Sequence, residues 1–213
     1  MTLVGYGLWC SIGAGDFAGR RALFLDRDGV VVEDTDYLGR ADDVRMIRGT
    51  ADAIARCNRL GIPVVLITNQ SGIGRGKYDW EGFQAVQAAI SAALETAGGR
   101  LDGVLACAYH ADASGKFRIA DHVWRKPKPG MILEAVRQMQ IDAPGSWIIG
   151  DRASDIETGR AAGLAGGILV LTGNGANDRD AALSHASERY AVEIAPDLGG
   201  AVAGLVEHGR LQI

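Results

Sequence analysis

Short apolar runs alternate with segments of helical spacing along most of the chain, and this alternation constrains the fold more than any other feature. Apolar runs of four to six residues predict buried strands at 22–25, 63–68, 103–108, 146–150 and 167–171. Apolar residues spaced three and four apart predict helices over 48–60, 79–97, 129–139 and 154–162. Strand and helix in regular alternation indicate a parallel sheet covered by helices on both faces. We therefore expect a doubly wound α/β fold.

The whole chain, residues 1–213, is predicted to form a single domain, because neither an internal repeat nor a low-complexity linker divides it. Residues 1–20 are expected to form a short arm ahead of the sheet, and 29–46 and 109–127 are expected to be inserted loops. The tail from about residue 178 is predicted to add a helix, a short strand at 191–194 and a last helix.

Composition excludes several classes of function. With 47% apolar residues the chain can bury a full core, which excludes a disordered protein. A net charge of −4 and only 6% aromatic residues disfavour nucleic acid and anionic membranes as partners. Glycine supplies 30 of the 213 residues, roughly twice the usual share. Such an excess indicates tight turns and close backbone approaches, as in loops that cradle a phosphate or a nucleotide.

Cysteine content points to a reducing compartment. Cys10, Cys57 and Cys107 are odd in number and show no pairing pattern, so we expect a cytoplasmic protein with free thiols. The first fifteen residues carry no charge, but they lack the Lys or Arg of a secretion signal, and two glycines interrupt the apolar run. We therefore expect an arm there and not a leader peptide.

Polar side chains follow four of the predicted strands at the point where each strand ends. Asp26 and Asp28 follow the first strand, Thr68 ends the second, Lys126 comes after the third, and Asp151 follows the fourth. In open α/β sheets, ligands bind beyond the carboxyl ends of the strands. These side chains are therefore expected to surround one site.

The residue types at this edge suit phosphoryl chemistry. Asp26, Asp28 and Asp151 would repel one another unless a hard cation such as Mg²⁺ neutralised them. Lys126 and the Thr68 hydroxyl could hold the oxygens of a phosphoryl group. One Asp could then attack the phosphorus, and the second, two residues on, could protonate the leaving oxygen. Water would hydrolyse the resulting phospho-aspartate.

Each of these residues also has a structural interpretation. An Asp at a strand end often caps a turn or a helix, and a single Lys is usually solvated. Asp155 could either orient Lys126 or cap the start of a helix. The functional interpretation rests on all four segments occurring in order, each behind a predicted strand.

The segments FLDRDGVV, DYLG, TNQSGIGRGK, RKPKPGM and IIGDRASDI resemble the haloacid-dehalogenase-like (HAD) phosphatase superfamily. The similarity is closer to one branch, the D-glycero-D-manno-heptose 1,7-bisphosphate phosphatases and the related histidinol-phosphatase domains, and extends from about residue 22 to 173. It implies a Rossmann-like sheet. No insertion exceeds about twenty residues, so we expect loops to roof the site without a separate cap domain.

The resemblance implies a role for each matching position. Asp26 would be the nucleophile and a Mg²⁺ ligand, Asp28 the acid and base and a backbone ligand, and Asp151 the remaining metal ligand. Thr68 and Lys126 would stabilise the transferring phosphoryl group. Substrate contacts are implied for Arg27, Asp34, Thr35, Asp36, Tyr37, Asn69, Gln70, Ser71, Arg125 and Arg152. A guanidinium such as that of Arg125 suits a second phosphate.

The resemblance implies a Mg²⁺-dependent phosphatase that removes the anomeric phosphate of heptose 1,7-bisphosphate, and we expect a monomer. A histidinol-phosphate phosphatase is an alternative on the same scaffold. A phospho-acceptor signalling domain also gathers acids, a Thr and a Lys around Mg²⁺, but it does not need an acid such as Asp28. A catalytically inactive binding protein is disfavoured, because every core position is present.

One segment departs from the branch, in which many members hold a structural zinc with three Cys and one His. At the matching positions only Cys107 keeps its thiol, while Tyr109, His122 and Trp124 replace the other ligands. A remodelled site from Cys107, His110 and His122, with Asp121 or water, is one interpretation. We expect the other, a loop without metal that is held by Trp124 packing and histidine hydrogen bonds, because Trp cannot ligate zinc.

Overall fold

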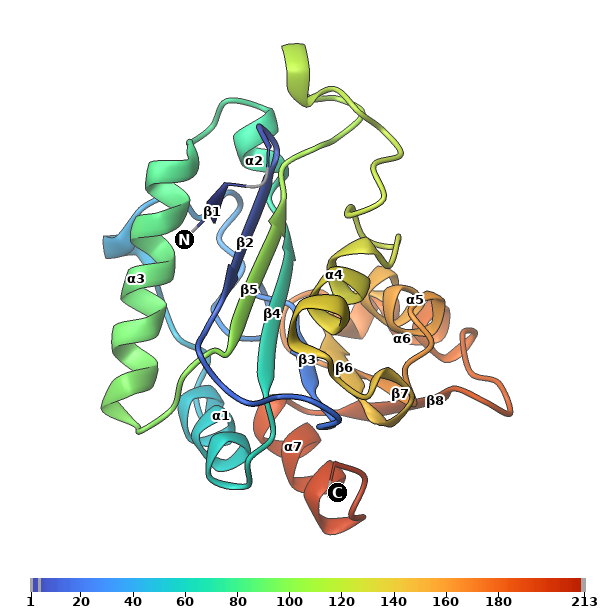
Figure 1. Cartoon of the computed structure of the whole chain (residues 1–213). Coiled ribbons are helices and arrows are strands. Elements are labelled where there is room, and N and C mark those ends of the chain that lie inside the picture. Colours follow the sequence, from blue (N-terminus) through green and yellow to red (C-terminus); the bar gives the residue numbers. More distant parts are fainter. Residues whose placement is uncertain (1, 4, 212–213) are drawn as a thin grey trace.

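The computed structural model describes residues 2–3 and 5–211 and confirms the expected α/β architecture (Figure 1). Eight strands within the described residues form one sheet in the order β1-β2-β5-β4-β3-β6-β7-β8. They are β1 (Thr2–Leu3), β2 (Leu8–Ile12), β3 (Leu23–Leu25), β4 (Val64–Asn69), β5 (Gly103–Cys107), β6 (Trp147–Gly150), β7 (Gly166–Val170) and β8 (Ala191–Ala195). The six strands from β5 to β8 in this order are parallel.

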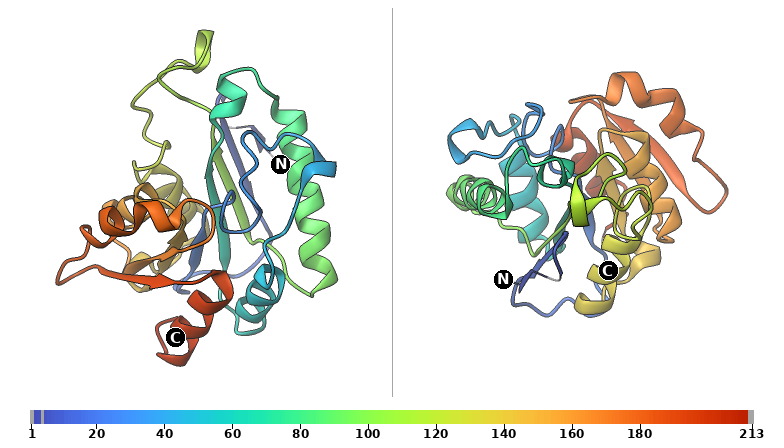
Figure 2. Two further views of the ribbon diagram at one scale, coloured as in Figure 1. Left: turned by 180° about the vertical axis from the view of Figure 1, so that it is seen from behind. Right: turned by 90° about the horizontal axis from the view of Figure 1, so that it is seen from above.

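Helices cover both faces of the sheet (Figures 1 and 2). One face carries α1 (Thr50–Arg59), α3 (Trp80–Thr96) and α7 (Leu198–Glu207), whose buried residues form one core cluster. The other face carries α4 (Gly130–Met139), α5 (Ala153–Ala161) and α6 (Gly175–Leu183). Short helical turns are α2 (Ser71–Gly74), η1 (Ala41–Asp43), η2 (Gly115–Phe117) and η3 (Ala143–Gly145).

The central strand β3 explains why the sequence folds in two layers around the sheet. Leu23 and Leu25 point into the cluster with α1 and α7, whereas Phe24 points into the opposite cluster. All three are fully buried, because successive side chains of a strand alternate between its faces and both faces are covered here. The continuous apolar run thus matches a central parallel strand.

The prediction of an arm over residues 1–20 is wrong for its central part. Strand β2 pairs antiparallel with β5 and extends the sheet, while Met1 and Val4 of the same segment lie outside the described residues. Trp9 of β2 packs against Trp80 and Phe83 of α3, with ring centroids 5.9 and 5.6 Å apart. The apolar run is therefore a strand of the sheet, which lies between β1 and β5, covers the exposed side of β5 and buries an aromatic ring.

The two inserted loops contain little regular structure, as expected for a fold without a cap domain. In the described chain, η1 and isolated bridges are the regular elements of 29–46, and η2 is that of 109–127. No helix among the described residues is long and apolar enough to span a lipid bilayer.

Candidate active site

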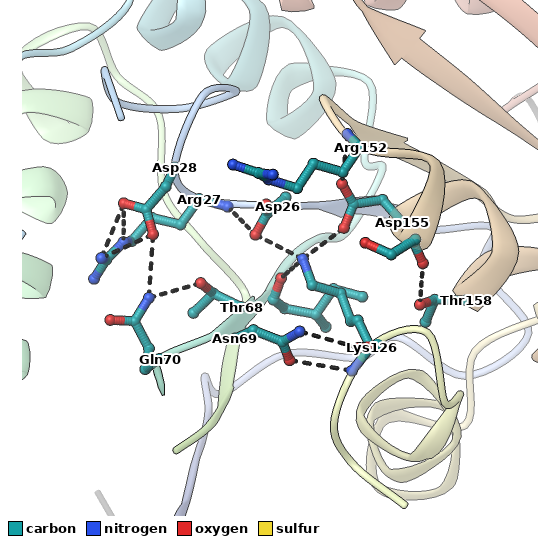
Figure 3. Close-up of polar contacts among 12 residues, drawn as sticks. Asp26, Arg27, Asp28, Thr68, Asn69, Gln70, Lys126, Arg152, Asp155 and Thr158 are labelled. Carbon is teal, nitrogen blue, oxygen red and sulfur yellow. Dashed lines mark hydrogen bonds and ion pairs between the residues drawn. The ribbon is translucent and has the colours of Figure 1, made fainter. Parts of the chain in front are cut away.

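The polar residues predicted to meet do meet, at the carboxyl ends of β3, β4 and β6 (Figure 3). Asp26 and Asp28 follow β3, Thr68 lies at the end of β4, and Lys126 comes from the loop between β5 and α4. They border a pocket of about 470 Å³. Asp151 follows β6 at the same edge and is completely buried.

Lys126 lies at the centre of the site. Its Nζ is 2.7 Å from Asp26 Oδ1 and 2.6 Å from Asp155 Oδ1, and it donates a hydrogen bond to the Ile67 carbonyl at 3.2 Å. Burial alone would lower the pKa of Lys126, but the two carboxylates outweigh burial and raise the pKa. The ammonium therefore stays protonated and keeps its charge inside the protein.

Asn69 fixes the main chain of Lys126. Its Nδ2 donates to the Lys126 carbonyl, and its Oδ1 accepts from the Lys126 amide, both at 3.1 Å. This paired contact ties the loop after β5 to the end of β4. Asn69 also lines the pocket, so the substrate contact implied by the resemblance stays a prediction.

Three buried carboxylates form an acidic cluster. Asp26, Asp151 and Asp155 each offer an oxygen within 4.8 Å of the others. Burial and the charge of Asp26 raise the pKa of Asp151 to about 7. Burial also raises the pKa of Asp155, to about 6, although Lys126 opposes the rise. Such crowding indicates a site for a divalent cation.

The oxygens available in this cluster fit Mg²⁺. Asp151 Oδ2 accepts from the Asn174 amide at 2.8 Å, whereas its buried Oδ1 has no hydrogen-bond partner among the described residues. Asp26 Oδ1 is engaged by Lys126 and by the Arg27 amide, which leaves Oδ2. Both oxygens of Asp155 are engaged, one by Lys126 and one by the Arg152 amide. Asp26 and Asp151 are thus the side chains best suited to hold the ion.

The expectation that the side chain of Asp28 joins this cluster is wrong. Its carboxylate turns away and accepts from Arg27 Nε and Nη2, both at 3.0 Å, and from Gln70 Nε2 at 3.2 Å. Asp155, four residues after Asp151, is the third acid instead. Side chains two residues apart share a face only within a strand, and β3 ends at Leu25, so Asp28 is free to pair with Arg27 and Gln70. The backbone ligand implied for Asp28 stays a prediction.

The environment of Asp28 suits a group that carries a proton. Burial raises the pKa of Asp28; the charge of Arg27 opposes this rise and that of Asp26 adds to it. Arg27 is itself almost completely buried, with its guanidinium 5.6 Å from the centre of the Phe83 ring. Arg27 therefore supports Asp28 from inside the protein, at the edge of the pocket.

Both structural roles considered for Asp155 occur together. Its Oδ1 pairs with Lys126, and its Oδ2 accepts from the Arg152 amide at 3.0 Å in a capping box at the start of α5. A carboxylate at the first turn of a helix is favoured by the helix dipole. The cap thus also fixes the position of the partner of Lys126.

Most of the residues implied to contact substrate surround the pocket. Those that line it are Arg27, Asp34, Asp36, Tyr37, Asn69, Gln70, Ser71, Arg125 and Arg152. Thr35 is exposed and lies outside this set, although its neighbours Asp34 and Asp36 belong to it. Arg152 is half-exposed at the rim, with Nη2 3.5 Å from Asp34 Oδ2.

Sequence reasoning missed several supports of the site. Tyr78 lines the pocket, and its hydroxyl donates to Gln70 Oε1. Gly29 and Gly173 enclose Asp151: a Cβ on either would lie 2.3 Å from Asp151 Oδ2, and their φ angles are +81° and +56°. Gly29 directly follows Asp28, so its position was a readable signal, whereas no pattern in the sequence singles out Tyr78.

The loop in which we considered zinc is held by packing and hydrogen bonds. Trp124 is buried in the core cluster beneath α4, and the Tyr109 ring stacks on His122 with centroids 4.4 Å apart. His110 and His122 accept backbone amides at Nδ1. Within residues 2–3 and 5–211, no group of three potential ligands converges here; the one convergent group is the acidic cluster. The absence of zinc itself stays a prediction.

Comparisons with known proteins agree with this geometry. A HAD-hydrolase-like family model matches residues 123–201. D-glycero-β-D-manno-heptose-1,7-bisphosphate 7-phosphatase of Mesorhizobium japonicum is 41% identical over 89% of this chain and 84% of that protein. The protein of the same name from Photorhabdus laumondii is 38% identical over 73% of this chain and 83% of its own length.

Two solved structures are similar over nearly the whole fold. A HAD-like phosphatase from Mesorhizobium loti, its function putative, has a TM-score of 0.86 and 38% identity, covering 97% of this chain and 96% of that one. D,D-heptose 1,7-bisphosphate phosphatase from B. bronchiseptica, complexed with magnesium and phosphate, has a TM-score of 0.77 and 31% identity. That match covers 88% of this chain and 99% of the other.

Mg²⁺ is expected to raise the melting temperature of the protein, and to do so more strongly at pH 8 than at pH 5. The pKa of Asp151 is about 7 in the folded protein against an ordinary 3.8, so the folded state retains a proton that the unfolded chain has lost. Without metal, stability therefore declines as the pH rises from about 4 to about 7. A bound cation takes the place of that proton.

Thermal denaturation after EDTA treatment, with and without added Mg²⁺, measures this effect. Asp151→Asn is expected to lose the Mg²⁺-dependent shift, and the matched control Asp180→Asn, on the exposed side of α6, is expected to keep it. An absent shift at pH 8 in the native chain, or an undiminished one in Asp151→Asn, would contradict the assignment.

Elemental analysis of protein purified without added metal is expected to find far less than one zinc per chain. Cys107, His110 and His122 offer too few ligands for a closed tetrahedral site. Near-stoichiometric zinc that survives dialysis and disappears in Cys107→Ser would instead establish a remodelled zinc site.

Proposed function

This chain belongs to the heptose-bisphosphate phosphatase family of the HAD-like hydrolases, and we propose that it hydrolyses D-glycero-D-manno-heptose 1,7-bisphosphate in a Mg²⁺-dependent reaction. The names of the relatives specify the 7-phosphate. They contradict the expectation that the anomeric phosphate leaves, so the 7-phosphate is the group that we propose to be transferred. A primary 7-phosphate extends from the end of the sugar, which suits an open pocket.

One observation carries the proposal: the side chains of Asp26 and Asp28 extend from the same turn into different surroundings. Asp26 faces Lys126 at 2.7 Å, whereas Asp28 is bound by Arg27 and Gln70 and has a raised pKa. Two carboxyl groups with environments this different can take the separate roles of nucleophile and acid. A phospho-acceptor domain has no need of the second group.

We assign the first step to Asp26. Its oxygen attacks the phosphorus, the bond to the sugar oxygen breaks, and Asp28 gives its proton to the leaving oxygen. Lys126 Nζ and the Thr68 hydroxyl stabilise the phosphoryl oxygens. Thr68 Oγ1 accepts a hydrogen bond from Gln70 Nε2 at 2.8 Å, so its own proton is free for that purpose.

The second step releases phosphate. Asp28, now ionised, accepts a proton from the water that attacks the phospho-aspartate, and Asp26 is regenerated as a carboxylate. Mg²⁺ held by Asp26 and Asp151 would lower the repulsion between these acids and the phosphate dianion. Asp155 keeps Lys126 in place throughout, through the 2.6 Å pair.

The rim offers charges for the second phosphate of the substrate. Arg125 and Arg152 both line the pocket and come from different segments, the loop before α4 and the start of α5. Arg125 Nη1 donates to the Tyr109 carbonyl at 3.0 Å, which directs the rest of its guanidinium. A planar guanidinium can bind a phosphate through two parallel hydrogen bonds.

We also propose that the enzyme works in the cytoplasm as a monomer, without nucleic-acid or membrane partners. The thiols of Cys10, Cys57 and Cys107 are free and buried, which suits a reducing compartment. One chain supplies the residues that line the pocket, and the net charge is −4.

Asp26→Asn is expected to abolish turnover in a folded protein, since the amide keeps the shape of the side chain but cannot attack phosphorus. Asp28→Asn is expected to lower kcat by ~10²–10⁴-fold for the sugar phosphate and much less for an activated aryl phosphate, which leaves without a proton. Steady-state kinetics on both esters, with melting curves as the control for folding, distinguish the roles. Equal losses on both esters in Asp28→Asn would exclude the acid role.

Heptose 1,7-bisphosphate is expected to be preferred over histidinol phosphate by roughly tenfold or more in kcat/KM, about the effect of one good contact. Histidinol phosphate offers no second phosphate to Arg125, so Arg125→Ala should erase most of the preference while leaving histidinol phosphate turnover nearly unchanged. The reverse order of kcat/KM in the native chain would identify a histidinol-phosphate phosphatase.

A further inference from the structure

The short helix α2 lies between the two loops that border the pocket. Its first residue, Ser71, lines the pocket, and the Gly74 carbonyl accepts a hydrogen bond from the Ser114 amide of the 109–127 loop at 3.0 Å. A Cβ on Gly72 would lie 2.8 Å from the Tyr37 ring, so the 29–46 loop packs on the same helix. Both loops are therefore placed relative to α2.

The 29–46 loop has an unusual backbone where it meets the pocket. Asp36 and Tyr37 have φ angles of +49° and +69°, and both line the pocket. Two consecutive side chains other than glycine in the left-handed region are unfavourable and persist only when surrounding contacts hold them. A contact that holds Tyr37 therefore determines the shape of this wall.

Arg75, directly after α2, makes that contact. Its Nη1 donates to the Tyr37 hydroxyl at 2.6 Å. Lys77 lies 5.9 Å from the centre of the same ring. Together with the packing on Gly72, these contacts fix both the plane and the tip of the Tyr37 side chain.

The other side of the Arg75 guanidinium holds the second loop. Nη2 lies 3.4 Å from Asp112 Oδ2 and 3.4 Å from His110 Nδ1, the ring nitrogen that also accepts from the Asp112 amide. Asp112 is largely exposed and is the acid paired with Arg75. One planar group thus joins the loop that carries Tyr37 to the loop that leads to Arg125.

We propose that Arg75 is a positioning residue that selects substrates extending beyond the transferred phosphate. It lies outside the set of described residues that line the pocket, so it acts by holding Tyr37 and the 109–127 loop where the far half of a substrate binds. The inference rests on the proposed function for the identity of that far half, a second phosphate. The phosphoryl group that reacts lies deeper, against Lys126, and does not depend on Arg75.

Kinetics on a long and a short substrate test the inference. Arg75→Ala is expected to lower kcat/KM for the sugar bisphosphate about tenfold, mostly through KM, and to change kcat/KM for a small aryl phosphate less than twofold. Tyr37→Phe removes only the hydroxyl and should give part of the same loss. Because both variants break the same hydrogen bond between Arg75 and Tyr37, kcat/KM of the double variant should be little lower than that of Arg75→Ala alone.

Controls separate positioning from folding. Arg75→Lys keeps the charge but cannot hold both loops with one planar group, so it should retain the selectivity defect in part. Arg59→Ala, an exposed arginine at the end of α1, should leave both substrates unaffected. Equal losses on the two esters, or no loss on either in Arg75→Ala and Tyr37→Phe, would overturn the inference.

A preliminary assay of the native chain tests the proposed substrate separately from the role of Arg75. The native chain is first assayed on heptose 1,7-bisphosphate and on a panel of sugar phosphates. Hydrolysis of other sugar phosphates without hydrolysis of the heptose bisphosphate refutes the proposed substrate. The Arg75 comparison then uses whichever sugar phosphate the native chain hydrolyses fastest. A selective loss there supports the positioning role, and a uniform one refutes it.

Discussion

The contact between Lys126 and the carboxylates of Asp26 and Asp155 is the interaction on which the site depends. Asp26, Asp151 and Asp155 crowd into a buried space, and when all three are ionised one ammonium leaves two negative charges, which one Mg²⁺ would balance. Removing ions from water is costly unless they are paired and hydrogen-bonded. The surrounding structure meets this need: Asn69 clamps the backbone of Lys126, and the cap of α5 fixes Asp155.

The proposed mechanism divides chemistry and recognition between different parts of the fold. Of the residues that we propose to react, Asp26, Asp28 and Thr68 stand at the ends of buried strands, and Asn69 ties Lys126 to the end of β4. We propose that recognition falls mainly to the loops 29–46 and 109–127, which must be positioned by local contacts since the described chain has no cap domain over them. Loops carried on a rigid scaffold can change their ligand without disturbing the core. Contacts such as that of Arg75 with Tyr37 therefore determine the shape of the pocket mouth.

Packing and hydrogen bonds hold the 109–127 loop among the described residues. In many members of the branch that the sequence resembles, a zinc ion fixes this segment. Here the Tyr109 ring stacks on His122, Trp124 is buried, and the Tyr109 carbonyl holds Arg125. Stacked rings that exclude water contribute more than their buried area alone. These contacts fix the path of the chain into Arg125 and Lys126.

The spacing of apolar residues and the order of strands and helices in the sequence determined the parallel sheet and its helices. They also determined that Asp26, Thr68, Lys126 and Asp151 gather, because strand ends in such a fold meet at one edge. Only the tertiary structure decided which acid completes the cluster. Asp28 turns toward Arg27, while Asp155 turns inward from the first turn of α5. The tertiary structure also decided that residues 8–12 extend the sheet, because no local sequence pattern indicates that one edge of β5 is free to pair. Strand β2 pairs with a strand about ninety residues away, and Asp28 and Asp155 also contact the distant residues Gln70 and Lys126, so no spacing within a segment encodes these arrangements.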